Sequence, residues 1–229
     1  MQQKIEQYEQ AITGEYKDKF DAFYSLLIEY NKRYNLTAIT EEKDVLYKHF
    51  LDSAVGEFLF PQNARVLEVG SGAGFPSLVL KLLRPDLQFT LLESIGKKCE
   101  FLRVASEQLH LQNVTVLNAR AEDVAKDALH RECYDAVCAR AVAQMNTLAE
   151  YCLPFVKKGG IFVAYKGGDV AEIENAKHAL SLLGGKIKQS YFYDLPENYG
   201  SRSLIVVEKI KNTPEKYPRG NGKERKNPL

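Results

Sequence analysis

The sequence predicts an α/β protein with a seven-stranded, mostly parallel sheet that ends in an antiparallel hairpin and follows a helical extension. Short apolar runs alternate with helix-length amphipathic stretches from Arg65 onward, which is the pattern of βαβ units. Before Arg65 the apolar spacing is helical. The last two apolar runs are separated by a short polar segment with Pro196 and Gly200, which favours a hairpin. With 229 residues, 45% of them hydrophobic and 27% charged, the chain fits one globular domain with small additions.

The helical extension is expected to comprise residues 1–62. Apolar side chains recur there at intervals of three and four residues, at Phe20, Phe23, Tyr24, Leu27 and Ile28. This spacing predicts an amphipathic helix that runs to about Tyr34, where the segment Asn35–Thr40 interrupts it. Thr40 is then expected to cap a second helix, which has an apolar face and ends near Pro61.

The sheet domain is expected to comprise residues 63–211. Its strands are expected at Arg65–Val69, Gln88–Glu93, Val114–Asn118, Ala136–Ala139, Gly160–Lys166, Lys186–Tyr193 and Ser203–Ile210. Helices are expected at Pro76–Leu83, Lys97–His110, Glu122–His130, Gln144–Val156 and Val170–Leu183. Strands that are joined by helices run parallel, so only the last two are expected to form a hairpin.

Charge is distributed unevenly along the chain. The net charge is only +1, yet residues 209–229 hold seven basic and two acidic residues and so carry +5, which leaves −4 on the rest. We therefore expect residues 212–229 to form a basic tail. No apolar signal-peptide core is present, and no stretch approaches the ~18 apolar residues of a membrane span, so a cytoplasmic protein is expected. The four cysteines lack C-x-x-C spacing, which favours structural thiols over a metal site.

A glycine-rich segment follows the first strand. Gly70, Gly72 and Gly74 precede a helix, a context in which glycines let the backbone approach a ligand closely. Their spacing is G-x-G-x-G, whereas dinucleotide enzymes carry G-x-G-x-x-G, and Glu68 lies two residues before the first glycine. A carboxylate there disfavours a pyrophosphate and suits a cofactor with a sulfonium and an ammonium group. The segment therefore predicts an S-adenosylmethionine site, with a structural turn or a nicotinamide site as alternatives.

Two more segments are expected to extend this site. Glu93 ends the second strand, where a Rossmann-like fold places the acid that accepts hydrogen bonds from both ribose hydroxyls. A solvated carboxylate at the end of a strand is the alternative. Ala121 and Glu122 follow the third strand and are expected at the rim where adenine docks. The alternative for Glu122 is an ordinary acid favoured by the dipole of a helix N-terminus.

The end of the fourth strand concerns the methyl acceptor. Methyltransferases that act on the amine of adenine carry D/N-P-P-Y/F there, whereas this chain has Cys138-Ala-Arg-Ala-Val142. Methylation at C5 of a pyrimidine needs a cysteine in a Pro-Cys pair, and Cys152-Leu-Pro154 has the opposite order. Arg140 suits a polyanionic or carbonyl-rich acceptor that needs no general base. His49 lies on an apolar helix face, which favours a buried core histidine over a catalytic one.

Five motifs along the chain point to one family. They are Asn35-Leu-Thr-Ala-Ile-Thr, His49-Phe-Leu-Asp-Ser, Gly70-Ser-Gly-Ala-Gly-Phe-Pro, Ala139-Arg-Ala-Val-Ala and Lys216-Tyr-Pro-Arg. In this order and over nearly the whole chain, they resemble the RsmG family, also called glucose-inhibited division protein B. The segment after Arg219 departs from the family pattern, because Gly220-Asn-Gly stands where members often have Lys-x-Gly-x-Pro.

The resemblance implies a Rossmann-like class I methyltransferase that uses S-adenosylmethionine to methylate N7 of one guanine in bacterial 16S ribosomal RNA. It also implies that Gly70, Phe75, Ala121, Glu122 and Arg140 contact the cofactor. N7 of guanine carries a lone pair and no proton, so substrate positioning is expected instead of a general base. The implied partner is 16S ribosomal RNA or the small ribosomal subunit, and a monomer is expected.

Basic side chains are expected to hold the RNA phosphates. The candidates are Arg140, Lys166, Arg202 and Arg219, each with a solvated or salt-bridged surface cation as the alternative. Two other functions stay open. One is a methyltransferase for a small molecule or a protein, in which the N-terminal helices form a lid. The other is a ribosome-binding module without catalysis, which the intact segment from Glu68 to Gly74 disfavours.

Overall fold

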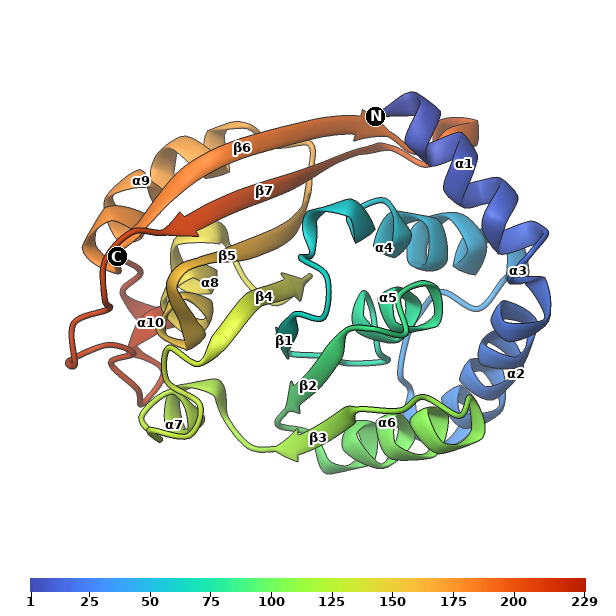
Figure 1. The fold of residues 1–229 in the computed structure, drawn as a ribbon, viewed down its shortest axis with the longest axis horizontal. Helices are drawn as coiled ribbons and strands as arrows, with labels where there is room; N and C mark the ends of the chain where they lie inside the picture. Colours follow the sequence, from blue (N-terminus) through green and yellow to red (C-terminus); the bar gives the residue numbers. More distant parts are fainter.

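One seven-stranded sheet runs through the computed structural model, which describes residues 1–229 (Figure 1). Its strand order is β3-β2-β1-β4-β5-β7-β6. The strands are β1 (Arg65–Val69), β2 (Gln88–Glu93), β3 (Val114–Asn118), β4 (Tyr134–Arg140), β5 (Val156–Gly167), β6 (Gly185–Asp194) and β7 (Ser201–Lys209). Strands β1 to β5 are parallel, and β7 is antiparallel to both β5 and β6. The predicted mostly parallel sheet with a C-terminal hairpin is therefore confirmed.

Helices precede the sheet and connect its strands. They are α1 (Gln2–Thr13), α2 (Lys17–Tyr34), α3 (Glu42–Val45), α4 (Asp52–Ala54), α5 (Ser77–Leu83), α6 (Gly96–Gln108), α7 (Ala121–Val124), α8 (Met145–Cys152), α9 (Ala171–Leu182) and α10 (Lys223–Lys226). A π-helical turn over Leu46–Leu51 joins α3 to α4. None of these helices combines the length and the apolar character that crossing a lipid bilayer requires.

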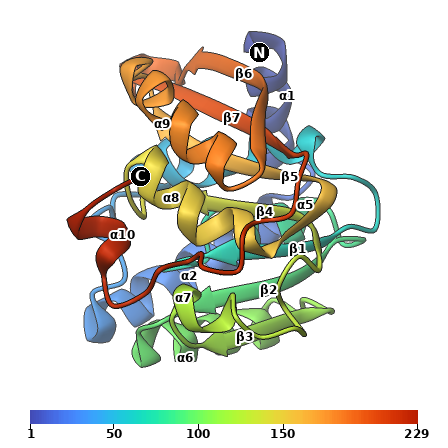
Figure 2. The same ribbon diagram turned by 90° about the vertical axis from the view of Figure 1, so that its left-hand side faces the viewer.

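The two faces of the sheet pack against different helices. Because side chains alternate along a strand, Val66 of β1 packs in a core with α2, α5 and α6, whereas Leu67 packs in a second core with α8 and α9 (Figure 2). The N-terminal helices belong to the first core. The ring of Phe75, next to the glycine segment, lies 5.4 Å from that of Phe23 in α2 and 6.1 Å from that of Phe50. The helical extension and the sheet domain thus share one core.

The N-terminal helices differ in part from the prediction. The sequence analysis did not predict α1. Only Ile5 and Ile12 of this helix are buried, so its apolar periodicity is weak. The prediction that Thr40 caps the second helix is wrong, since α3 begins at Glu42 and Glu41 is the residue before it. The apolar residues of that helix continue instead through the π-helical turn, which is wider than an α-helix and is often found at functional sites.

Two predicted helices of the sheet domain are too long. The one at Glu122–His130 ends early, because the carboxylate of Asp127 accepts a hydrogen bond from the Leu129 amide at 2.9 Å and so favours a local turn. The one at Gln144–Val156 ends at Cys152. Pro154 has no amide hydrogen to continue the helix, and a short 3₁₀ turn leads directly into β5.

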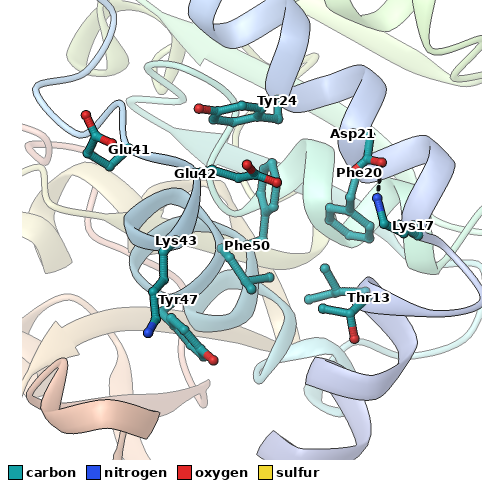
Figure 3. Close-up of a pocket in the computed structure, with 12 residues that line it drawn as sticks. Thr13, Lys17, Phe20, Asp21, Tyr24, Glu41, Glu42, Lys43, Tyr47 and Phe50 are labelled. Atoms are coloured by element: carbon teal, nitrogen blue, oxygen red, sulfur yellow. Dashed lines mark hydrogen bonds and ion pairs between the residues drawn. The ribbon is translucent and has the colours of Figure 1, made fainter.

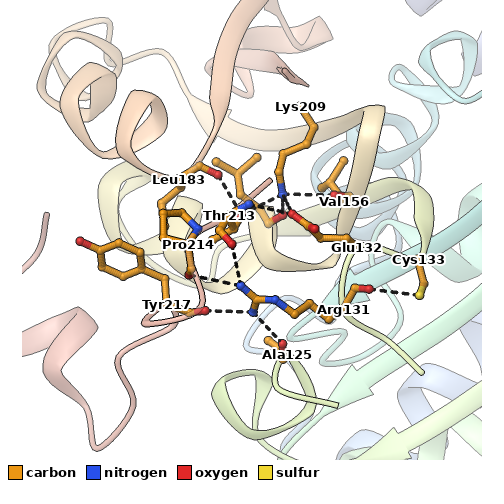
Figure 4. A network of polar contacts seen from close by, with 11 residues as sticks. Ala125, Arg131, Glu132, Cys133, Val156, Leu183, Lys209, Thr213, Pro214 and Tyr217 are labelled. Carbon is orange, nitrogen blue, oxygen red and sulfur yellow. Dashed lines mark hydrogen bonds and ion pairs between the residues drawn. The ribbon is translucent and has the colours of Figure 1, made fainter. Parts of the chain in front are cut away.

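The C-terminal segment adds Tyr217 to the second core, and a polar network joins its start to the sheet domain (Figure 4). Arg131 donates hydrogen bonds to the carbonyl oxygens of Thr213 at 2.9 Å and Tyr217 at 3.0 Å. The fully buried ammonium group of Lys209 donates to the Thr213 hydroxyl at 2.8 Å and pairs with Glu132 at 3.0 Å. Because the two bonds from Arg131 join residues more than 80 positions apart, the segment after β7 is anchored to the sheet domain at its start.

Candidate active site

The carboxyl ends of β1, β2 and β4 lie side by side at one edge of the sheet. β1 pairs with β2 on one side and with β4 on the other. The strands β2 and β3 therefore extend the sheet in one direction from β1, and β4 and β5 extend it in the other. In open parallel sheets, such a point leaves a crevice beyond the strand ends where ligands bind. The glycine segment, Glu93 and Arg140 follow or end these three strands.

The glycine segment turns sharply from β1 toward α5. Gly70, Gly72 and Gly74 all have positive φ angles, of 72°, 55° and 87°. A Cβ atom at Gly74 would lie 2.4 Å from the side chain of Leu78, and one at Gly70 would lie 2.7 Å from that of Val142. Glycine is therefore required at these two positions both by conformation and by close packing.

Glu93 supports this turn from the neighbouring strand. One carboxylate oxygen accepts a hydrogen bond from the Gly72 amide at 3.0 Å, and the other accepts one from the Ile95 amide at 2.8 Å. The side chain is 6% exposed. Each oxygen can accept a second hydrogen bond, so the fixed carboxylate is suited to two adjacent hydroxyl groups.

A pocket opens beside Glu93. Its lining includes Gly70, Ala121 and Glu122, which the sequence analysis placed together at a cofactor site. Val142, from the loop after β4, also lines the pocket, as do two residues that the sequence analysis did not consider, Tyr151 of α8 and Arg225 of α10. Backbone turns, an acid and a crevice at the strand ends fit a nucleoside-containing cofactor.

Glu68 lies beneath the glycine segment and does not line the pocket. The register of β1 and β4 places it beside Cys138, and its side chain is fully buried. Neither carboxylate oxygen has a hydrogen-bond partner. Burial raises the pKa of Glu68 to about 8, and the nearby Ser77 hydroxyl and Arg140 guanidinium oppose only part of that rise. Its carboxyl group is therefore largely neutral at pH 7, and its position beneath the glycine segment does not bring it to the pocket that Gly70 lines.

Arg140, at the end of β4, is held by residues of the N-terminal helices. Its guanidinium donates to the carboxylate of Asp52 at 3.0 Å, to the carbonyl of Lys48 at 2.8 Å and to Nδ1 of His49 at 3.0 Å. The group also lies 5.2 Å from the ring centre of Phe75. Arg140 is therefore oriented from several sides.

His49 is buried, as expected for a core histidine. Because Nδ1 accepts the hydrogen bond from Arg140, the ring proton is on Nε2, which lies 2.9 Å from the Thr37 hydroxyl oxygen and donates to it. The ring stacks on Phe75 with 4.4 Å between centroids. Burial, followed by the Arg140 charge, lowers the pKa of His49 to about 3. His49 is thus neutral near pH 7 and serves as a hydrogen-bond acceptor for Arg140.

This cluster brings together four of the five sequence motifs. Thr37, His49, Asp52, Phe75 and Arg140 come from separate motifs or separate parts of one. The sequence analysis quoted Asp52 only as part of a motif and missed its role. Its side chain is 7% exposed and, besides binding Arg140, accepts a hydrogen bond from the hydroxyl of a β6 tyrosine, Tyr193, at 3.0 Å. Its position within a quoted motif was the available signal.

A second cavity, of about 340 Å³, lies against this cluster. Three of the four cations predicted to hold RNA line it, namely Arg140, Lys166 and Arg202, and Lys48 adds a fourth basic side chain. All four of these groups have acidic partners, since Arg140 pairs with Asp52 at 3.0 Å and Lys48 pairs with Asp44 at 2.7 Å. Lys166 lies 2.5 Å from Glu172, and Nε of Arg202 lies 3.6 Å from Asp52. The cavity is therefore a basic, partly neutralised surface beside the strand ends.

Arg219, the fourth predicted cation, lies elsewhere. Its guanidinium donates to both oxygens of Glu150 in α8, at 2.9 Å from Nε and 2.7 Å from Nη2. Glu150 is fully buried, and Arg219 lines neither the pocket beside Glu93 nor the basic cavity. The geometry matches the salt-bridged alternative that the sequence analysis kept open for this residue.

A larger cavity, of about 530 Å³, lies apart from the strand ends (Figure 3). It is bounded by α1, α2, α3 and the π-helical turn, with residues such as Phe20, Tyr24 and Glu42 in its wall. No residue of the sheet lines it. Size alone therefore does not identify the functional site of this protein.

Comparison with known proteins agrees with these sites. A family model described as rRNA small subunit methyltransferase G, also named GidB, matches residues 16–198. The chain belongs to this family. Ribosomal RNA small subunit methyltransferase G of Brevibacillus brevis is 45% identical over 222 residues, which cover 96% of this chain and 93% of that protein. The protein of the same name from Staphylococcus aureus strain Newman is 43% identical over 230 residues, covering 99% of this chain and 96% of the relative.

Solved structures outside the rRNA small subunit methyltransferase G family show the same fold. The O-methyltransferase of Bacillus cereus, in complex with SAH, superimposes with a TM-score of 0.57 at 18% identity, covering 82% of this chain and 91% of that one. TYW2 of M. jannaschii, in complex with AdoMet, has a TM-score of 0.55 at 16% identity, with 69% of this chain and 75% of that one covered. The fold is therefore that of class I methyltransferases, as predicted.

Proposed function

We propose that this protein transfers the methyl group of S-adenosylmethionine to N7 of a guanine in small-subunit ribosomal RNA. The observation that carries the proposal is the juxtaposition of two sites through the loop after β4. Val142 lines the pocket beside Glu93, whereas Arg140 and Ala141 line the basic cavity. Membership of the rRNA small subunit methyltransferase G family supports the same reaction.

The residues of the pocket fit the cofactor. Glu93 would accept the ribose hydroxyls, and the turn at Gly70 admits a ligand close to the backbone. Ala121 and Glu122 would border the adenine. S-adenosylmethionine, when bound, supplies an electrophilic methyl group on a positively charged sulfur. The family resemblance also assigns cofactor contacts to Phe75 and Arg140, whose side chains contact each other, with Arg140 at the basic cavity.

The basic cavity fits a nucleotide of an RNA strand. Arg140, Lys166 and Arg202 would neutralise phosphates or donate to the base, and the stack of Phe75 and His49 keeps Arg140 in one orientation. His49 is not suited to remove a proton at neutral pH, because it already accepts a hydrogen bond from Arg140, and the Asp52 carboxylate is bound by Arg140 and Tyr193. N7 of guanine needs no such group, since its lone pair attacks directly.

Several further properties belong to the proposal. The substrate would be 16S ribosomal RNA, free or within the small subunit, and the protein would act as a monomer in the cytoplasm. Residues 1–62 and 212–229 would serve as additions that complete the acceptor and cofactor sides of residues 63–211. A methyltransferase for a small molecule or a protein is the alternative, for which the basic cavity offers no support.

Methyl incorporation tests the proposal directly. Labelled S-adenosylmethionine, the protein and small subunits from cells that lack the modification should give labelled 16S ribosomal RNA. Chemical cleavage specific for N7-methylguanosine should then map a single site. Arg202→Ala should reduce incorporation, whereas Lys177→Ala, an exposed cation of α9 outside both sites, should not. Cofactor binding without any RNA labelling, or labelling on an atom other than N7, contradicts the proposal.

A further inference from the structure

Arg225 is the only residue of the C-terminal segment that lines the cofactor pocket. Its Nη2 lies 3.4 Å from the carbonyl oxygen of Val142, the residue whose side chain covers Gly70. Its other neighbour is Tyr151 of α8. Burial raises the pKa of Tyr151, and the adjacent Arg225 guanidinium opposes that rise, while Glu122 acts on the same hydroxyl from the pocket rim. Arg225, Tyr151 and Glu122 thus line one pocket.

The short helix that carries Arg225 is fixed to α8. The hydroxyl of Thr147 donates to the carbonyl oxygen of Glu224 at 2.8 Å. The Glu224 side chain is fully buried and accepts a hydrogen bond from the Gly220 amide. The ion pair between Arg219 and Glu150 anchors the preceding turn. Arg225 is therefore held at the pocket by a built structure.

The chemistry of this position favours a nucleoside. A guanidinium group is planar and stacks on aromatic faces, and Glu122 in the same pocket is an acceptor suited to the edge of an adenine. Lys223 and Lys226 on the same helix are exposed and do not line the pocket. Arg225 is exposed as well, so it differs from these two lysines in lining the pocket.

We propose that Arg225 binds the adenosine part of the cofactor by stacking its guanidinium on the base. The C-terminal segment then forms a wall of the cofactor site and is more than a basic arm for RNA. This inference rests on the proposed function, because it takes the pocket beside Glu93 as the S-adenosylmethionine site.

Calorimetry with two ligands tests the inference on the full-length protein. S-adenosylhomocysteine contains the adenosine and the amino-acid part, whereas methylthioadenosine lacks the amino-acid part. Arg225→Ala should lower the affinity for both ligands by the same factor, about 5- to 20-fold. Arg225→Lys should bind both ligands nearly as weakly as Arg225→Ala does, since lysine keeps the charge but lacks the planar group. Lys223→Ala, the matched control on the same helix, should bind both ligands like the wild type.

The outcomes separate the inference from the proposed function. Absence of S-adenosylhomocysteine binding by the wild type refutes the proposed function itself. Normal wild-type binding with an unchanged Arg225→Ala affinity refutes the inference alone. If Arg225→Ala loses affinity for S-adenosylhomocysteine but not for methylthioadenosine, Arg225 binds the amino-acid part. If Arg225→Lys binds both ligands like the wild type, the contact is purely electrostatic. Both results overturn base stacking.

Discussion

Arg140 shows how a single residue connects the two halves of the site. It ends a strand beside the cofactor pocket, yet its partners Asp52 and His49 come from the N-terminal helices. A guanidinium held by three hydrogen bonds and an aromatic face has little freedom to rotate, so in the proposed reaction the acceptor would meet a preorganised cation. Glu93 and Glu68 show two further uses of a buried acid, one satisfied by backbone amides and one without partners.

Replacement of Glu93 should affect cofactor affinity. Glu93→Ala loses two charge-assisted hydrogen bonds to the ribose and also frees the Gly72 amide, so affinity should fall by about 2–4 kcal/mol. Titration calorimetry with S-adenosylmethionine measures the loss. Glu100→Ala, which removes an exposed acid of α6, serves as the control. Unchanged affinity of Glu93→Ala would remove Glu93 from the site.

Glu68 should make the stability of the cofactor-free protein depend on pH. Its folded-state pKa of about 8 exceeds the value of 4.5 expected when unfolded, so protonation favours the folded state. This proton-linked contribution to the free energy of unfolding is fully present below pH ~4.5 and is lost as the pH rises to about 8. Relative to Glu68→Gln, the wild type should lose stability over this window, by at most on the order of 5 kcal/mol.

Urea denaturation of both proteins between pH 5 and 9 measures this difference. The gap between Glu68→Gln and the wild type should widen up to about pH 8 and then level off, because the folded-state carboxyl group is then ionised. A constant gap across the range would show that Glu68 titrates normally.

Methyl transfer at saturating cofactor should show no step that depends on His49 protonation between about pH 6 and 9. His49 has a pKa of about 3 and stays neutral throughout this range. His49→Gln, which keeps a hydrogen-bond acceptor for Arg140, should retain most of the single-turnover rate. Arg140→Ala should lose far more activity with an unchanged pH profile. A wild-type slope that disappears in His49→Gln would make His49 the base and refute the mechanism.

At the scale of elements, α8 organises the second face of the sheet. Its residues Thr147 and Glu150 contact the C-terminal segment, and Tyr151 lines the pocket beside Glu93. The hairpin of β6 and β7 acts similarly on the other side, since Tyr193 and Arg202 both approach Asp52. The site is thus built from segments that are distant in the sequence and adjacent in the sheet.

Arg219 should contribute to stability more than to RNA binding. Arg219→Ala leaves the fully buried carboxylate of Glu150 without its cation, which should lower the free energy of unfolding by about 3 kcal/mol. Under folding conditions its affinity for ribosomal RNA should match that of the wild type. Arg202→Ala provides the opposite pattern, with weaker RNA binding and little loss of stability. Denaturation and filter binding measure the two effects, and a reversed pattern would assign Arg219 to the RNA surface.

At the scale of the whole molecule, one core joins the N-terminal helices to the sheet. Phe23, Phe50 and Phe75 form a continuous aromatic cluster that ends at His49. Loss of packing in α2 is therefore transmitted to the residues that hold Arg140.

Phe23→Ala should destabilise the entire protein in one transition. The ring is fully buried, so its removal should cost about 3–5 kcal/mol. Circular dichroism of the helices and tyrosine fluorescence should lose their signals at the same denaturant concentration, because the N-terminal helices share the core on one face of the sheet. Tyr30→Ala, in the same helix but on the edge of the core, should cost less. Two separate transitions would show that residues 1–62 fold independently.

The sequence by itself determined the alternation of strands and helices, the turn at Gly70 to Gly74 and the strand-end position of Glu93. These features depend on local periodicity and on the conformational freedom of glycine, which neighbouring residues reveal. Helix lengths after Ala121 and Gln144 were less predictable, because a single side chain or proline ended them.

Only the tertiary structure decided which charged residues act together. Arg202 approaches Asp52 across 150 positions, Arg140 meets His49 across 91, and Arg219 pairs with Glu150 instead of lining the basic cavity. A surface cation and a buried ion pair have the same sequence signature. Their difference arises from desolvation and from the partner that the fold brings near, and neither is encoded by local spacing.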